Sequence, residues 1–157
     1  MTMRLQRQFD FLLEAEKLRR IERQNLILDG SRAENSAEHS WHLALYALAL
    51  APLADPDVNI DRVIRMLLLH DLVEIDAGDH PITDDVDCEP VVVSELAAAK
   101  RLSASLPEDQ GGELFDLWRA FEAGESLDAR LAKHLDHCQP IFQTLHCADA
   151  PEFHFHV

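Results

Sequence analysis

The chain has 157 residues, of which 47% are hydrophobic and 27% are charged, a composition typical of a globular domain. Its formal net charge of −15 argues against binding to nucleic-acid polymers, because lysine and arginine supply the affinity for a phosphate backbone. We expect a single domain over residues 1–157, long enough to build a core without disulfides or a structural metal.

The N-terminal third predicts two helices joined by a loop. Apolar residues at helical spacing indicate a helix from about residue 5 to residue 23, and residues 27–35 form an expected loop. Asn35 can cap the second helix, because Glu38, three residues later, can reach back to the backbone of Asn35. We expect this second helix to end at Pro52.

The middle of the chain predicts three more helices. A third helix is expected over residues 59–78, where Gly78 stops it, and an acidic loop follows over residues 79–87. The apolar pattern then indicates a fourth helix over about residues 89–106 and a fifth over residues 107–124.

A sixth helix is expected after Ser126, which can serve as its cap, with a kink at Pro140. Residues 146–157 lack a helical period and predict an irregular tail whose histidines are solvated. Strand-like alternation is absent, so the sequence predicts an all-α compact bundle of about six helices with its core over about residues 5–145. The expected apolar stripe of the sixth helix is Leu127, Leu131, Leu135, Cys138, Phe142 and Leu145.

Cysteine usage and hydropathy give an expected compartment. Cys88, Cys138 and Cys147 are odd in number and show no CxxC spacing, as in reduced proteins. No apolar run approaches the roughly 20 residues of a membrane span, and the N-terminus has no signal-peptide core. We therefore expect a cytoplasmic protein that does not bind membranes.

The segment Leu67–His80 places polar residues inside an apolar helix. His70 and Asp71 stand side by side among leucines, and burial of a carboxylate without a partner is costly. Glu74 lies four residues after His70 and can share its helix face. This helix alone leaves two interpretations open: half of a site for a divalent metal, or a buried His–Asp ion pair that holds helices together.

Two other predicted helices carry further candidates. His39 lies in the first turn of the second helix and His42 follows within one turn, while Asp136 lies at the border of the apolar stripe of the sixth helix. A lone histidine is more often an ordinary core or surface residue, and we interpret His42 in that way. A lone aspartate on a helix is more often solvated, so these positions by themselves do not establish a site.

In chain order, "AEHS", "LLLHDLVEIDAGD" and "ARLAKHLD" resemble the HD-domain metal-dependent phosphohydrolase superfamily. The chain is similar to the branch that contains bacterial 5′-deoxynucleotidases and HD-domain-containing protein 2, over about residues 5–145. The resemblance implies an HD-domain helical bundle and one divalent metal ion, with Mn, Co, Mg, Fe, Ni and Zn all left open. It also implies the metal ligands, which would be His39, His70, Asp71 and Asp136.

The resemblance further implies catalytic roles for two carboxylates beyond the ligands. Glu74, in HDxxE, and Asp79, in "AGD", match the catalytic acids of the family. Hydrolysis of a phosphomonoester requires charge stabilisation, an oriented water and a proton for the leaving oxygen. Glu74 can reach that water from one turn beyond His70, and Asp79 can position the water or assist the leaving group.

Two arginines are candidates for binding the substrate. In the deoxynucleotidases that the chain resembles, an Arg-Trp pair before the first ligand helix contacts the nucleotide, and the matching residues here are Arg23 and Gln24. Arg23 can pair with a phosphate group through two hydrogen bonds, whereas Gln24 replaces the aromatic residue. Arg32 is a second candidate for the phosphate contact.

Together these features predict a divalent-metal-dependent phosphohydrolase that acts on (deoxy)nucleoside 5′-monophosphates or similar small phosphomonoesters. The alternative is a non-catalytic or weakly active helical module with a structural metal site. The expected partners are a small phosphorylated substrate and a second copy in a homodimer, and they include neither nucleic-acid polymers nor membranes.

Overall fold

The computed structural model of the protein describes residues 2–80 and 88–147, and it is built almost entirely from helices. The predicted all-α class is therefore confirmed. The described residues also contain three 3-10 segments, η1 (Glu16–Arg20), η2 (Ala51–Leu53) and η3 (His70–Val73), and two short strands, β1 (Glu22–Leu26) and β2 (Ala33–Asn35). The α-helices are α1 (Met3–Ala15), α2 (Ser36–Leu50), α3 (Ile60–Leu69), α4 (Glu74–Ala77), α5 (Cys88–Ser105), α6 (Glu108–Ala123) and α7 (Leu127–His146).

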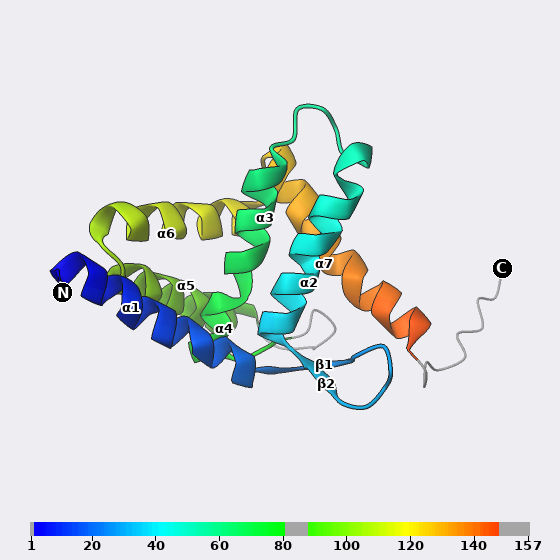
Figure 1. The fold of residues 1–157 in the computed structure, drawn as a ribbon, viewed down its shortest axis with the longest axis horizontal. Coiled ribbons are helices and arrows are strands. Elements are labelled where there is room, and N and C mark those ends of the chain that lie inside the picture. Colours follow the sequence, from blue (N-terminus) through cyan, green and yellow to red (C-terminus); the bar gives the residue numbers. More distant parts are fainter. Residues whose placement is uncertain (1, 81–87, 148–157) are drawn as a thin grey trace.

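Helix α3 lies at the centre of the arrangement. It packs against α2 and α7 on one side and against α6 on the other, while α5 lies between α6 and α1 (Figure 1). The β-hairpin runs below α2 and joins the end of η1 to the start of α2. This layout brings the first turn of α2, the last turn of α3 and the middle of α7 toward one another.

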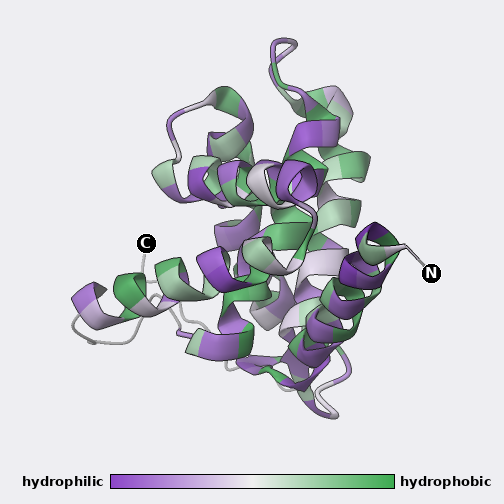
Figure 2. Ribbon diagram, turned by 90° about the vertical axis from the view of Figure 1, so that its left-hand side faces the viewer, coloured by the Kyte–Doolittle hydropathy of each residue, from purple (hydrophilic) through white to green (hydrophobic). Residues whose placement is uncertain are grey.

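The central core forms where α2, α3, α6 and α7 meet. Both hydrophobic and hydrophilic residues occur along the helices (Figure 2), and the core is formed by the hydrophobic residues that the packed helices bury between them. None of the helices in residues 2–80 and 88–147 combines the length and the hydropathy needed to cross a bilayer. The buried residues of this core are Leu43, Ala47, Val63, Met66, Leu67, Leu117, Phe121, Ala129, Ala132 and Leu135.

The hairpin replaces the expected end of the first helix and the expected loop over residues 27–35. Strands β1 and β2 pair antiparallel with Glu22 opposite Asn35, and the backbone N–H of Ser36 donates to the carbonyl of Ile21. Gly30 in the connection has a φ of +72°, which favours glycine. The strands alternate in exposure rather than in hydropathy, so the sequence carried no strand signal.

The expected third helix is broken where its polar residues begin. Helix α3 ends at Leu69, His70 caps it and opens η3, and α4 then runs to Gly78, whose φ is +83°. The predicted stop at Gly78 is confirmed. His70 and Glu74, however, are joined by a 3-10 turn and not by the continuous α-helix that was expected. The tighter 3-10 turn directs His70 and Asp71 together into the interior.

The apolar stripe predicted for the sixth helix is confirmed at Leu131 and Leu135 and wrong at its other residues. Although Ser126 caps α7 as expected, Leu127, Phe142 and Leu145 are each at least 41% exposed, and Cys138 is exposed as well. The helix instead buries small and amide side chains, which allow it to approach α2, α3 and the hairpin closely. Helix α7 continues through Pro140 to His146, and residues 148–157 of the expected tail lie outside the described residues. The buried residues of α7 are Ala129, Ala132, Leu135, Gln139 and Gln143.

Candidate metal centre

Three of the predicted metal ligands converge from three different helices. His39 comes from the first turn of α2, His70 from the end of α3 and Asp136 from the middle of α7, and their donor atoms lie within 4.8 Å of one another. Asp136 Oδ1 lies 3.0 Å from His39 Nε2 and 3.5 Å from His70 Nε2. Both histidines are almost fully buried, so the cluster is part of the interior.

The fourth predicted ligand, Asp71, lies beside this group. Its Oδ1 is 3.0 Å from His70 Nε2, and its Oδ2 is 3.2 Å from the guanidinium of Arg23. The 3-10 turn η3 holds Asp71 next to His70. The structure therefore brings all four predicted ligand side chains together.

Local hydrogen bonds orient His70 toward the centre of the cluster. Its Nδ1 lies 2.9 Å from the carbonyl oxygen of Leu67, which can only accept, so Nδ1 carries the proton and donates. Nε2 is buried, has no hydrogen bond of acceptable geometry, and faces Asp71 and Asp136. A buried imidazole nitrogen left in this way among carboxylates fits a divalent cation, which takes mixed nitrogen and oxygen ligands.

A group of carboxylates around one arginine lies next to the ligand cluster. The guanidinium of Arg23, from β1, lies 3.2 Å from Asp71, 3.6 Å from Glu74 and 3.5 Å from Asp79. Burial, together with the nearby Asp71 charge, raises the pKa of Glu74 to about 9. Burial and Asp71 likewise raise the pKa of Asp79, although Arg23 opposes the rise. One guanidinium thus does not offset these carboxylates, and a bound cation would supply the missing positive charge.

The histidines and the aspartates of the cluster shift one another's pKa values in opposite directions. Burial alone lowers the pKa of His70, but Asp71 and Asp136 raise it well above its ordinary value. His39 behaves in the same way, because Asp136 and Glu34 outweigh burial and raise its pKa. Burial raises the pKa of Asp136, yet the hydrogen bond with His39 and the nearby charge of His70 hold this pKa well below its usual range. Burial raises the pKa of Asp71, but the charge of His70 outweighs burial and lowers this pKa below its ordinary value.

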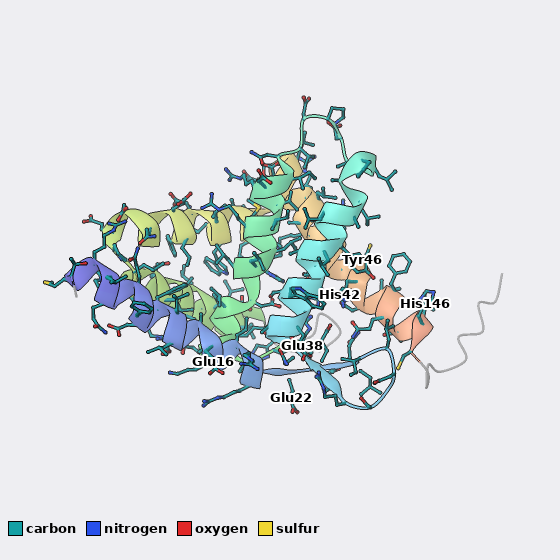
Figure 3. All side chains as sticks on the ribbon, in the orientation of Figure 1. Glu16, Glu22, Glu38, His42, Tyr46 and His146 are labelled. Carbon is teal, nitrogen blue, oxygen red and sulfur yellow. The ribbon has the colours of Figure 1, made fainter. Side chains whose placement is uncertain are left out.

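The other singled-out residues lie around the cluster rather than in it. Arg32 donates to both oxygens of Glu38 at 2.7 and 2.8 Å, so a role in binding phosphate would require it to leave this pair and stays a prediction. Gln24 is exposed, on the face of β1 opposite Arg23. His42, on the side of α2 next to α7, receives a hydrogen bond from Gln139 and is not part of the metal group (Figure 3).

Two buried residues beside His39 were not predicted from the sequence. Gln139 Oε1 lies 3.1 Å and Glu34 Oε2 lies 3.4 Å from Nδ1 of His39. Glu34 belongs to the unpredicted strand β2, so no pattern pointed to its burial. Gln139 follows Asp136 by three residues, which places both on one face of α7, and this spacing was the only signal available.

Comparison with known proteins agrees with this arrangement. A family model for the HD domain matches residues 15–157. The human 5′-deoxynucleotidase HDDC2 is 32% identical over 134 residues, which make up 85% of this chain and 64% of the human protein. The bovine 5′-deoxynucleotidase HDDC2 is 34% identical over 134 residues, with the same coverage. The chain therefore spans slightly less than two thirds of the length of these curated relatives.

Solved structures resemble the chain over most of its length. A crystal structure described as a predicted metal-dependent phosphohydrolase from Magnetospirillum magnetotacticum has a TM-score of 0.87 and 50% identity, and the match covers 91% of this chain and 71% of that one. An HD-domain phosphohydrolase from Listeria innocua, at 18% identity, shares the fold, with a TM-score of 0.68 and coverage of 87% and 67%. From the family match and the sequence identity to these relatives, the chain belongs to the HD domain family.

Proposed function

We propose that the protein is a divalent-metal-dependent phosphohydrolase that acts on (deoxy)nucleoside 5′-monophosphates or similar small phosphomonoesters. The observation that carries the proposal is the convergence of His39, His70 and Asp136 inside the core, next to Asp71. The 5′-deoxynucleotidase relatives support the substrate class. The structural neighbour described as a metal-dependent phosphohydrolase supports the reaction type.

In this proposal His39, His70, Asp71 and Asp136 hold one divalent cation. When bound, the cation supplies positive charge for the phosphate oxygens and lowers the pKa of water. Two imidazole and two carboxylate ligands suit Mn, Fe, Co, Ni or Zn, and Mg is a further candidate. Because four protein ligands do not fill an octahedral shell, water and a phosphate oxygen can also bind.

Arg23 is the proposed contact for the phosphate group. Its side chain is 16% exposed and already lies against Asp71, Glu74 and Asp79. A guanidinium can form two parallel hydrogen bonds to phosphate, which fixes the orientation of the phosphorus atom as well as binding it. Arg23 would therefore orient the substrate for in-line attack.

Glu74 and Asp79 are the proposed acid–base groups. The raised pKa of Glu74, about 9, means that this buried carboxyl can hold a proton at neutral pH before a cation offsets the charge of Asp71. Glu74 can then exchange a proton with the attacking water or with the leaving ribose oxygen. Asp79, which contacts the same guanidinium nitrogen of Arg23, would orient that water or assist the leaving group.

The test replaces one ligand and measures metal and turnover together. Asp71→Ala should lose both bound metal, by elemental analysis, and phosphatase activity against a panel of deoxy- and ribonucleoside monophosphates. Unchanged metal content in this variant would contradict the ligand assignment. Wild-type protein that binds metal but turns over no substrate in the panel would favour the non-catalytic helical module with a structural metal site.

A further inference from the structure

The buried amides of α7 form a continuous chain of hydrogen bonds from the hairpin to His39. The side-chain N–H of Gln143 donates to the backbone carbonyl of Leu26 at 2.9 Å. Gln139 in turn donates to Oε1 of Gln143 at 2.6 Å, and Oε1 of Gln139 lies 3.1 Å from Nδ1 of His39. Both glutamines and His39 are at least 95% buried.

The direction of this chain is fixed at its hairpin end. A backbone carbonyl can only accept, so Gln143 must turn its NH₂ group toward Leu26 and its oxygen toward Gln139. Gln139 must then present its NH₂ group to Gln143, which leaves its oxygen toward His39. Reversal of either amide would set oxygen against oxygen in a buried site, at the cost of unpaired polar groups.

The last link determines which nitrogen of His39 carries the proton. Nδ1 faces two acceptors, Oε1 of Gln139 and Oε2 of Glu34 at 3.4 Å, so Nδ1 must be protonated and donate. Glu34 is only 3% exposed, and its Oε1 lies 3.3 Å from the amide nitrogen of Gln139, whose two hydrogens face Gln143, His42 and Glu34. Nε2 lies 3.0 Å from Asp136, whose carboxylate can only accept, so in the metal-free protein Nε2 donates as well. A bound cation would displace this Nε2 proton, whereas the Nδ1 proton stays between its two acceptors.

We propose that Glu34, Gln139 and Gln143 are positioning residues that lock His39 as the Nδ1–H tautomer, with Nε2 presented to the divalent cation. This inference rests on the metal site of the proposed function and adds the residues that prepare it. The carbonyl of Leu67 orients His70 in the same way through a local contact. His39 is instead oriented by the chain of hydrogen bonds from Leu26 through Gln143 and Gln139, which we call the relay. Partners of this kind set the orientation and basicity of metal-binding imidazoles.

The relay also gives the hairpin a function. Strand β1 carries Arg23 at the front of the cluster and ends at Leu26, the start of the relay, while β2 carries Glu34 behind His39. Asn25 fastens the same strand to α7, because its side chain donates to the carbonyl of Pro140 at 3.2 Å. The hairpin therefore orients both the substrate side and the ligand side of the proposed site.

The first test measures affinity for Zn²⁺ alone, by competition with a chelator of known affinity and without substrate. Gln139→Met and Gln143→Met keep the side-chain volume roughly unchanged but break the relay, and we expect Zn²⁺ to bind about 10- to 100-fold more weakly. Gln110→Met is the matched control, because it removes another amide–amide hydrogen bond, the one from Gln8 at 2.7 Å, at the α1–α6 contact. We expect the control to bind Zn²⁺ within about twofold of wild type, as a site remote from the cluster should.

Affinities within twofold of wild type in both relay variants, with cooperative thermal unfolding retained, would overturn the inference. A second measurement does not depend on whether the variants fold. In the Zn²⁺-loaded wild-type protein, ¹⁵N NMR should show Nε2 of His39 bound to metal and Nδ1 protonated. A His39 bound through Nδ1, or protonated at Nε2, would overturn the assignment of the tautomer.

The outcomes separate this inference from the proposed function. Zn²⁺ binding that depends on the relay, without turnover of any phosphomonoester, would contradict the proposed enzyme and leave the inference standing. Turnover that needs metal while the relay variants bind Zn²⁺ normally would contradict the inference and leave the enzyme standing. A wild-type chain that binds no Zn²⁺ would overturn the inference directly.

Discussion

The guanidinium of Arg23 lies 3.2 Å from the carboxylate of Asp71, and this contact joins the hairpin to the cluster of candidate metal ligands. The two residues are 48 positions apart in sequence and both are largely buried. A charge-assisted contact of this kind couples the residue proposed to bind phosphate to a residue proposed to bind metal.

Replacement of Arg23 should weaken substrate binding. Arg23→Met removes the proposed phosphate contact, and loss of a charged hydrogen bond of about 1.5–3 kcal/mol should raise KM about 10- to 100-fold. Arg32→Met is the matched comparison, because Arg32 is the other candidate and pairs with Glu38 on the surface. We expect less than a twofold change in KM for Arg32→Met, and a larger effect there than at Arg23 would reverse the assignment.

Glu74→Gln should separate proton transfer from metal binding. The variant keeps the size of the side chain and leaves the four candidate ligands in place, but it cannot exchange a proton with water or the leaving group. We expect kcat to fall about 10²- to 10⁴-fold, the usual contribution of a general acid or base, with metal content unchanged. Turnover near the wild-type level would show that Glu74 is not the proton-transfer group.

In the metal-free protein, stability should fall as the pH rises from 6 to 9. Because the pKa of Glu74 is raised from 4.5 to about 9, the folded state keeps a proton that the unfolded chain has lost in this range. The raised pKa values of His39 and His70 act in the same direction, since their contribution is present below about pH 6.5 and is lost above their folded pKa values. Thermal unfolding in excess EDTA should therefore give a lower Tm at pH 9 than at pH 6.

Two controls sharpen this expectation. Glu74→Gln should flatten the dependence, because it removes one of the groups that hold the extra proton. A saturating divalent cation should also reduce it, because the cation replaces the protons on the histidines. A metal-free Tm that stays constant or rises between pH 6 and pH 9 would contradict the assigned directions of the pKa shifts.

The adjacent glycines of α6 should respond in opposite ways to alanine. A Cβ atom at Gly111 would collide with the backbone carbonyl of Ser103, whereas at Gly112 it would meet no atom within 4 Å. Gly112→Ala should stabilise the protein by about 0.5–1 kcal/mol, because alanine favours the helix. Gly111→Ala should destabilise it by about 1–3 kcal/mol through overpacking. Urea unfolding checks both, and equal effects would contradict the described α5–α6 contact.

Local signals made the helices and their caps predictable. Asn35 and Glu38 form the capping box that their spacing indicates, and Ser126 accepts a hydrogen bond from the N–H of Ala129 as a helix cap should. Gly124 ends α6 in the left-handed conformation, which favours glycine. Each of these interactions joins residues at most four positions apart, so a short stretch of sequence is enough to predict it.

The candidate ligands were proposed from the resemblance of three short motifs to a known family, whereas the surroundings of these residues depend on long-range contacts. Glu34 and Gln139 meet across 105 positions, through a hairpin whose strands have no apolar alternation. The break at His70 carries no Pro or Gly signal, since it arises where polar residues turn into the core. Apart from Leu135, the buried face of α7 was missed because small and amide side chains such as Ala132 and Gln139 occupy it.

The central claim is that the buried His–Asp cluster binds the divalent cation required for phosphate release. The most direct measurement is phosphate release from a panel of deoxy- and ribonucleoside 5′-monophosphates, with EDTA-treated protein to which Mn²⁺, Co²⁺ or Mg²⁺ is added back. We predict no turnover after EDTA and recovery with at least one of these ions. Turnover that persists without metal, or metal-loaded protein that hydrolyses no substrate in the panel, would contradict the account.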